Sequence, residues 1–264
     1  MKIIEKFTRS KTSIEKDNED CFFIDDNFAV VVDGVTSKKA NSQKETNGRF
    51  VAQFVCVCFS TISASLAPFE ILKELNARLR VALRAQNRKG ESAGGSIVVY
   101  NAKRQELFSY GDCCYRIGDE QFQQRKASDI ILSQKRSAIL KQALAQGATI
   151  KELQDNDIGR QAIIEDLLSA SKNANSIGED GYGVLDGKEI IEEYIKVIKV
   201  EQGQTIILSS DGYPSLFPTL KLTEKNLMQL LKKDPLCIHE LLGTKGVLSK
   251  NESYDDRTYL RLIT

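Results

Sequence analysis

Apolar runs separated by polar turns predict strands near both ends of the chain and helices between them. Residues 28–32 form an unbroken apolar run rich in β-branched side chains, which is typical of a buried strand. Asp26 and Asn27 separate it from the apolar run before it, so a hairpin is expected in which Asp33 lies opposite residue 20. Strands are expected at 2–7, 21–25, 28–33, 96–100, 106–110, 115–118, 121–124, 181–185, 193–200, 205–212 and 257–263.

Two helices are expected after the hairpin. Residues 48–67 are apolar on nearly all sides, but Arg49 and Gln53 interrupt them, so a buried helix is favoured over a membrane span. Pro68 begins an amphipathic helix with leucines on one face.

The middle of the chain is polar and helical near 133–172, with Ser133 as the expected cap of its first helix. Two C-terminal helices are expected to begin at Thr223 and Pro235. Polar loops are expected at 36–47 and 90–95.

Strand-rich ends with few β-α-β alternations favour an α+β layered fold. The chain has 264 residues without an internal repeat or a low-complexity linker, so residues 1–264 are expected to form a single domain.

The composition excludes several partner classes. A net charge of +1 and the absence of Trp give no basic-aromatic surface, so neither nucleic acid nor a membrane is expected as a partner. The N-terminus has no apolar core of signal-peptide length. The six cysteines form no C-x-x-C pair, and Cys56 and Cys58 are expected to be buried thiols. A reducing cytoplasm is the expected location.

His239 is the only histidine, and it lies in an apolar helical pattern where a structural or surface role is favoured. Histidine-based triads and HEXXH zinc sites are therefore disfavoured or excluded. Any metal would be held by oxygen, which favours Mg²⁺ or Mn²⁺.

Carboxylates recur at the ends of predicted strands. Asp33-Gly34 and Asp211-Gly212 each follow a buried apolar run, which suggests a shared polyanionic site. A buried carboxylate costs free energy unless a cation or hydrogen-bond donors compensate it. Each such residue alone is a common turn residue, but several occur in order: Glu19, Asp20, Asp33, Asp112, Asp211, Asp255 and Asp256.

The ordered motifs are Asn18-Glu19-Asp20, Val32-Asp33-Gly34, Gly94-Gly95-Ser96, Gly111-Asp112, Leu208-Ser209-Ser210-Asp211-Gly212 and Asp255-Asp256-Arg257-Thr258. Over essentially the whole chain, this set resembles the PPM family of PP2C-type, metal-dependent protein Ser/Thr phosphatases, in its bacterial form. The resemblance implies a four-layer α-β-β-α sandwich of two mainly antiparallel sheets flanked by helix pairs. It also implies a variable helical segment, here near 133–172, beside the active site.

The resemblance further implies two Mn²⁺ or Mg²⁺ ions. Asp33 would bridge both, the Gly34 carbonyl would bind one, Asp211 and Asp255 would bind the other, and Glu19 and Asp20 would hold metal-bound waters. A hydroxide bridging the ions would attack phosphorus in line, hydrolysing phosphoserine or phosphothreonine on a protein, and a monomer is expected.

Three positions depart from the family pattern. Glu15 stands where an arginine usually grips the phosphate; Arg9, Lys11, Lys16 and Arg49 are the candidate replacements, and the phosphate-binding residue is left unassigned. Asp112 could hold a third ion, but Ser215 stands where its second acidic ligand is expected. Val35 replaces the histidine that follows Asp-Gly in many eukaryotic members, so a metal-bound water would protonate the leaving group.

Two other functions are alternatives to a metal-dependent phosphatase. A HAD-type phosphatase needs a nucleophilic aspartate where Val31 stands, which disfavours it. A regulatory or binding module of the same fold, with weak or no turnover, is favoured by Glu15 and opposed by the retained carboxylates. An assay of Mn²⁺-dependent phosphate release discriminates between the module and the enzyme.

Overall fold

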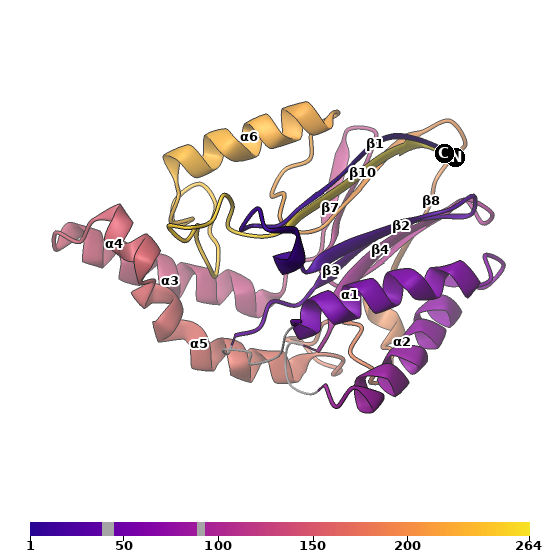
Figure 1. Ribbon diagram of the computed structural model, residues 1–264, viewed down its shortest axis with the longest axis horizontal. Coiled ribbons are helices and arrows are strands. Elements are labelled where there is room, and N and C mark those ends of the chain that lie inside the picture. Colours follow the sequence, from indigo (N-terminus) through magenta and orange to yellow (C-terminus); the bar gives the residue numbers. More distant parts are fainter. Residues whose placement is uncertain (39–44, 89–92) are drawn as a thin grey trace.

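Two five-stranded antiparallel sheets pack face to face in the computed structural model, which describes residues 1–38, 45–88 and 93–264 (Figure 1). The first sheet contains, in spatial order, β1 (Lys2–Arg9), β10 (Arg257–Ile263), β9 (Thr205–Ser209), β6 (Cys114–Ile117) and β7 (Glu120–Gln123). The second contains β2 (Asp20–Ile24), β3 (Phe28–Gly34), β4 (Gly95–Asn101), β5 (Glu106–Tyr110) and β8 (Lys196–Lys199). The predicted α+β sandwich is confirmed.

The protein has three apolar layers, which explain why the sequences of the central strands are continuous apolar runs. Side chains alternate across a strand. In β3, Val30 and Val32 face the layer beneath the helices, whereas Ala29 and Val31 face the layer between the two sheets. Both faces of β3 are therefore buried, and neither needs polar residues. A third apolar layer separates the first sheet from the C-terminal helix.

The helices α1 (Asn47–Cys58) and α2 (Pro68–Ala85) cover the second sheet (Figure 1). The helix expected over 48–67 is shorter than predicted and passes into a 3-10 turn, η2 (Phe59–Thr61). Ser60 Oγ and Thr61 Oγ1 donate hydrogen bonds to the carbonyls of Val57 and Cys58, which compete with continued helix. Among the described residues, no helix has the length and apolar character needed to cross a bilayer.

Among the described residues, α6 (Leu220–Lys233) is the one α-helix packed on the first sheet, so the prediction of a helix pair on this face is wrong. Its cap is Thr219, not the predicted Thr223, because Thr219 Oγ1 accepts the Leu222 amide N–H. The helix expected from Pro235 does not form. The Asp234 carboxylate instead accepts the amide N–H groups of Ile238 and His239 and folds this segment into a turn.

The strand expected at 181–185 is also wrong, because the segment makes only isolated bridges. The Asn175 side chain bonds both the amide and the carbonyl of Val184 and so replaces a strand partner. The strand expected over 193–200 is reduced to β8, after a 3-10 turn, η4 (Glu192–Tyr194).

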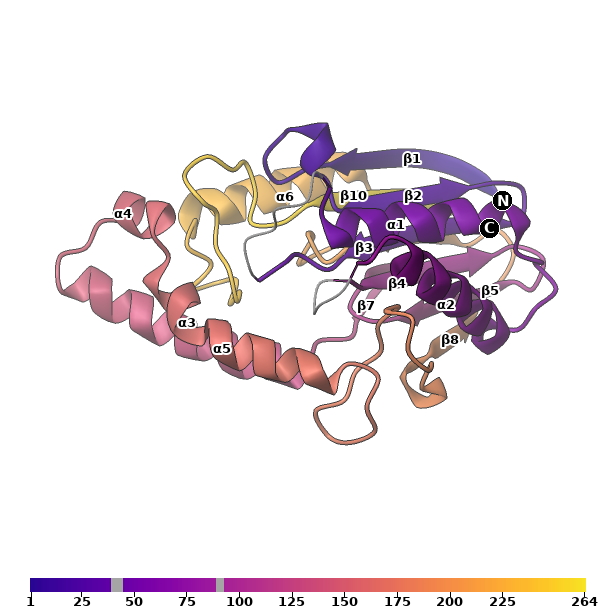
Figure 2. The ribbon, with the colours of Figure 1, turned by 60° about the horizontal axis from the view of Figure 1, so that its bottom comes forward.

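The predicted helical middle segment is present as α3 (Ala127–Ala145), α4 (Ile150–Asp155) and α5 (Ile158–Ala170), which project from the sandwich (Figure 2). The first of these begins at Ala127, and Ser133 lies within it rather than capping it. Of the predicted loops, 36–47 and 90–95, residues 39–44 and 89–92 lie outside the described residues.

Candidate metal and phosphate site

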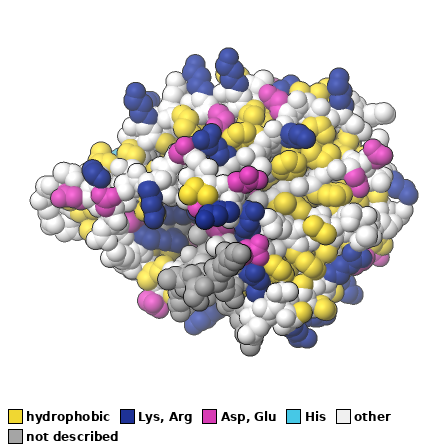
Figure 3. Space-filling view, viewed as in Figure 1, with side chains coloured by type: hydrophobic (Ala, Val, Ile, Leu, Met, Phe, Trp, Pro, Cys, Tyr) yellow, Lys and Arg dark blue, Asp and Glu magenta, His cyan; other side chains and the backbone are white. Residues whose placement is uncertain are grey.

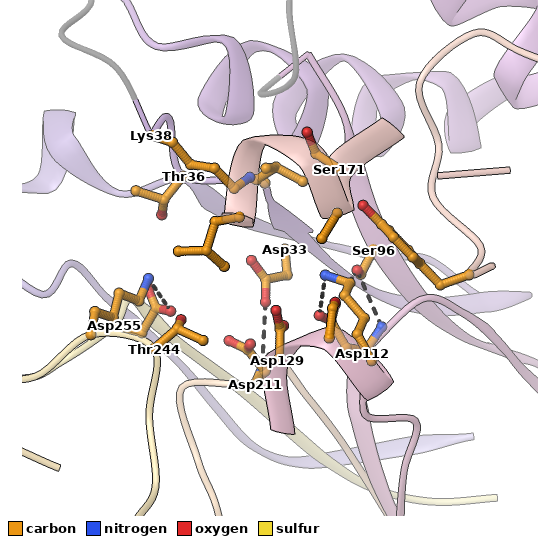
Figure 4. A pocket seen from close by; sticks show the side chains of 18 of the residues that line it. Asp33, Thr36, Lys38, Ser96, Asp112, Asp129, Ser171, Asp211, Thr244 and Asp255 are labelled. Atoms are coloured by element: carbon orange, nitrogen blue, oxygen red, sulfur yellow. Dashed lines mark hydrogen bonds and ion pairs between the residues drawn. The ribbon is translucent and has the colours of Figure 1, made fainter. Parts of the chain in front are cut away.

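A pocket at one end of the sandwich is lined by aspartates from both sheets. Asp33 is the penultimate residue of β3, Asp211 follows β9, and Asp255 precedes β10. Figure 4 shows Asp33 and Asp211 side chains near the centre, with Asp255 on one side and Asp112 on the other. The sequence prediction that strand-end carboxylates share a site is supported for these four residues.

The β2–β3 hairpin has the predicted register, with Asp20 opposite Asp33. Gly34 continues β3, and its amide N–H donates to the Glu19 carbonyl at 3.1 Å. A Cβ at Gly34 would lie 2.2 Å from the Gly48 carbonyl oxygen, so only glycine allows the first turn of α1 to approach this strand end. Close helix packing therefore explains the glycine.

Three carboxylates, two of them on the pocket wall, have no ion-pair partner among the described residues. Within the described residues, Asp20, Asp33 and Asp211 form no ion pair, and the buried Asp20 Oδ2 has no hydrogen-bond partner. Burial, and then the negative charge of Asp20, raises the pKa of Asp33 well above its ordinary value. Burial and the charge of Asp33 do the same to the pKa of Asp211. This half of the cluster has the excess negative charge that a divalent cation would balance.

The other half of the cluster is already paired with a half-buried lysine, Lys11. The Lys11 ammonium donates hydrogen bonds to Glu19 Oε2 at 3.1 Å, Thr36 Oγ1 at 3.1 Å and Asp256 Oδ2 at 3.2 Å, and lies 3.6 Å from Asp255 Oδ1. Burial alone would lower the pKa of Lys11, but the surrounding carboxylates raise it overall.

A second lysine completes the pairing of Asp255. Lys245 Nζ lies 2.5 Å from Asp255 Oδ2. Burial alone would raise the pKa of Asp255, but the charges of Lys245 and Lys11 lower it overall.

Asp112, the possible ligand of a third ion, has its own lysine partner. Lys126 Nζ lies 2.6 Å from Asp112 Oδ2, and Ser96 Oγ donates to Asp112 Oδ1. Burial alone would raise the pKa of Asp112, but the charge of Lys126 lowers it overall. Ser215 is exposed. That a third ion is disfavoured stays a prediction. The pairing of Asp112 with Lys126 supports it, because the lysine already balances the carboxylate.

None of the four proposed arginine replacements was found on the pocket wall among the described residues. Arg49 NH1 donates to the carbonyls of Glu15 and Asn18 at 3.0 and 2.7 Å, which anchors the 3-10 turn η1 (Glu15–Asp17) instead. Arg9 pairs with the exposed Glu252 and Lys16 is exposed, whereas the half-buried Lys11 is paired with carboxylates.

Four other cations line the pocket: Lys38, Lys126, Arg160 and Lys245. Sequence reasoning missed them as pocket residues, because they come from loops and from the helical segment, which share no sequence motif with the strand ends. Arg160 NH1 donates to the Thr244 carbonyl at 2.9 Å, linking α5 to the C-terminal loop. Figure 3 shows Lys and Arg side chains beside Asp and Glu near the middle of one face.

The side chains of one half of the cluster fit the divalent ion that the motifs imply. No three carboxylate, histidine or cysteine side chains in the described ranges already surround a metal position. The donors are nevertheless all oxygen, as Mg²⁺ and Mn²⁺ prefer, and Asp20 Oδ2 is buried without a partner. The Asp20–Asp33–Asp211 half therefore fits a divalent ion after side-chain adjustment, whereas Lys11 already neutralises the Glu19–Asp255 half.

The histidine and the thiols are poorly suited to act as nucleophiles at this site. His239 is exposed, as the surface reading predicted, and its amide N–H bonds Asp234. Cys56 and Cys58 are buried as predicted. Burial raises the pKa of the Cys113 and Cys114 thiols beside the cluster, which disfavours thiolate chemistry there.

Comparisons with models of protein families and with curated proteins found no match. Among solved structures, the chain is similar to the catalytic domain of the serine/threonine protein phosphatase PstP in complex with two manganese ions. The two chains share 13% identity with a TM-score of 0.51, and the match covers 100% of each.

Two further solved structures have similar scores. Serine/threonine phosphatase Stp1 from Staphylococcus aureus is 14% identical, with 98% of this chain and 94% of that chain covered and a TM-score of 0.51. A serine/threonine phosphatase from S. agalactiae is 11% identical, with 98% of each chain covered and a TM-score of 0.50. The chain therefore has the fold of these phosphatases, and the similarity at these identities concerns the fold alone.

Proposed function

We propose that this protein is a divalent-metal-dependent phosphatase that hydrolyses phosphoserine and phosphothreonine on proteins. The observation that carries the proposal is the meeting of Asp33, Asp211 and Asp255 in one pocket together with cationic side chains. A carboxylate cluster holds metal ions, and neighbouring cations attract a phosphate dianion. The fold shared with PstP and Stp1 supports the same reaction class.

In this proposal Asp33, the Gly34 carbonyl, Asp211 and Asp255 are the metal ligands, and Glu19 and Asp20 orient water by accepting its hydrogen bonds. A bound Mn²⁺ or Mg²⁺ would supply an activated water and would neutralise charge on the transferred phosphoryl group. Two ions remain the expected number. The single histidine is exposed and the nearby thiols are buried with raised pKa values, so the residues of the site favour attack by water over attack by a side chain.

Arg160 is the residue that we propose to bind the substrate phosphate in place of the missing arginine. It lines the pocket, and its guanidinium carries five N–H donors in a planar fork that matches a phosphate. Lys126 and Lys245 line the same pocket but are paired with Asp112 and Asp255. Arg160 comes from α5, so the helical segment beside the site would contribute directly to substrate binding.

The test is phosphate release from a phosphoserine peptide, a phosphothreonine peptide and an aryl phosphate, with Mn²⁺ and with chelator. We expect hydrolysis only with the metal. Asp211→Ala should lower kcat/KM on the order of a hundredfold or more, since metal ligation supplies several kcal/mol of transition-state stabilisation. Asp119→Ala, at a side chain that is 99% exposed, is the matched control and should keep full activity. Full activity in chelator, or an unchanged Asp211→Ala, contradicts the proposal.

A second function is favoured by one specific observation, the pairing of Glu19, Asp255 and Asp256 with Lys11. A site neutralised by its own lysine suits a regulatory or binding module of the same fold without turnover. Tight Mn²⁺ binding with no phosphate release from any of the three substrates would favour this module over the enzyme.

A further inference from the structure

Lys11 makes the contacts of a bound cation inside the acidic cluster. An ammonium group has three N–H donors, and all three acceptors are present: Glu19 Oε2, Thr36 Oγ1 and Asp256 Oδ2. Only 15% of the side chain is exposed, so these charges interact with little screening by solvent. The ammonium is therefore saturated with acceptors and largely removed from water.

The two halves of the cluster differ in their compensating charge. Glu19, Asp255 and Asp256 carry three negative charges against the positive charges of Lys11 and Lys245. In the other half, Asp20, Asp33 and Asp211 form no ion pair within the described residues, and the buried Asp20 Oδ2 lacks any hydrogen-bond partner. The orphaned oxygen and the carboxylates without an ion pair point to a cation in that half.

A divalent ion and the Lys11 ammonium repel each other at short range. The repulsion between two like charges grows as their separation and the local dielectric constant fall, and a divalent ion doubles it relative to a monovalent one. The same carboxylate oxygens cannot serve both cations without that cost. An ion that takes Asp255 as a ligand and uses Glu19 to orient its water thus requires the ammonium to leave.

We propose that Lys11 is a built-in cation that takes one of the two expected metal positions. The chain then binds one divalent ion tightly, at Asp33 and Asp211 beside Asp20, and a second one only by displacing Lys11 from the ligand Asp255 and from the water-orienting Glu19. This inference rests on the metal dependence in the proposed function. The second ion would then compete with a side chain of the protein, Lys11, for the same carboxylates.

The backbone around Lys11 allows the side chain to be tested without removing the loop. The Lys11 amide N–H donates to Asp256 Oδ1 at 2.8 Å, and the Lys11 carbonyl accepts the Glu252 amide N–H at 2.8 Å. Both bonds survive in Lys11→Met, which removes the ammonium and keeps a long side chain. Lys11→Arg keeps the positive charge.

The experiment counts bound Mn²⁺ by the electron paramagnetic resonance of free Mn²⁺ during titration of metal-free protein. We expect one tight ion for the wild type and two for Lys11→Met, with the second bound at least tenfold more tightly than in the wild type. Lys11→Arg should bind one ion. Lys135→Met, which removes an exposed lysine paired with Asp166, is the matched control and should also bind one.

Two comparable tight ions in the wild type overturn the proposal, and so does a Lys11→Met variant with the wild-type count. If Lys11→Met fails to fold, the ion counts of the wild type and of Lys11→Arg still test the proposal. Two tight ions in either protein overturn it. Ion counting does not depend on turnover. A count of one that rises to two, without any phosphate release, supports this inference while contradicting the proposed enzyme; a wild type that binds no Mn²⁺ contradicts both.

Discussion

At the scale of single residues, the aspartates of the pocket are chemically identical but have different surroundings. Asp33 and Asp211 lie near other carboxylates, and burial together with those charges raises their pKa values. Asp255 and Asp112 are half-buried as well, but neighbouring lysines lower their pKa values overall. In the sequence all four are simply aspartates at strand ends, so it is the positions of Lys11, Lys126 and Lys245 that distinguish them.

Arg160 provides a prediction at this scale. Arg160→Lys keeps the positive charge but removes the planar fork, so we expect KM for a phosphopeptide to rise about tenfold while kcat changes little. Steady-state kinetics with Mn²⁺ measure both constants.

The matched control is Arg78→Lys, in an ion pair with Glu74 on α2, which should leave both constants unchanged. Thermal unfolding of Arg160→Lys separates phosphate binding from the bond between Arg160 and Thr244. An unchanged KM, with any loss of rate explained by a lower apparent kcat that matches the loss of folded protein, contradicts the assignment of Arg160.

At the scale of elements, the helical segment is held to the body of the protein by a buried ion pair. Arg136 of α3 is fully buried, and its NH2 lies 2.7 Å from Asp157 Oδ2, at the start of α5. Its NH1 also donates to the Gly243 carbonyl at 3.0 Å in the loop that carries Thr244 and Lys245. Arg136 thus joins three segments that line or support the pocket.

We predict that Arg136→Met lowers the free energy of unfolding by about 3–5 kcal/mol, because it leaves a buried carboxylate unpaired. Urea unfolding at neutral pH measures the loss. Lys135→Met, at the residue before Arg136, removes an exposed ion pair and should lower the free energy of unfolding by less than about 1 kcal/mol. The double variant Arg136→Met/Asp157→Asn should recover part of the loss, and full additivity of the two changes would show that the ion pair is not the cause.

At the scale of the whole molecule, folding itself creates the excess negative charge of the pocket. Asp33 belongs to the second sheet and Asp211 follows a strand of the first, so they meet only when the two sheets pack. The Asp211 amide N–H then lies 3.4 Å from Asp33 Oδ2. Without a metal ion this arrangement costs folding free energy, and a bound ion offsets the cost.

Asp211→Asn tests that cost. The pKa of Asp211 is raised above its ordinary 3.8 in the folded protein, so the stability it contributes is present at acid pH and is lost as the pH rises through the folded pKa. The neutral asparagine avoids this loss. In chelator, the variant should therefore be more stable than the wild type at pH 7 to 8, on the order of 1 kcal/mol per unit of pKa shift, and nearly equal below about pH 4.

Thermal and urea unfolding across this pH range measure the difference. Mn²⁺ should stabilise the wild type more than Asp211→Asn, because the variant has lost a ligand. Asp119→Asn, at a fully exposed aspartate, is the control and should follow the wild type. A variant that is less stable than the wild type in chelator at neutral pH would contradict the charge argument.

The sequence by itself determined the local parts of this protein. The apolar run of β3, the tight turn before it and the pairing of Asp20 with Asp33 follow from side-chain alternation and turn geometry, which act over a few residues. The order of the Asp-Gly motifs indicated which strand ends would share a pocket. The absent helix after Pro235 shows the limit, because the contacts of Asp234 with the following amides overrode the helical pattern.

Tertiary structure alone decided how the charge of the site is balanced. Lys11, Arg160 and Lys245 are far apart in the chain and follow no motif, yet the fold brings them to the same acidic cluster. The electrostatic energy of a buried group depends on the distances and burial of all its neighbours, which no local pattern encodes. The sequence therefore indicated which carboxylates would gather, and only the packed fold showed that a lysine already lies among them.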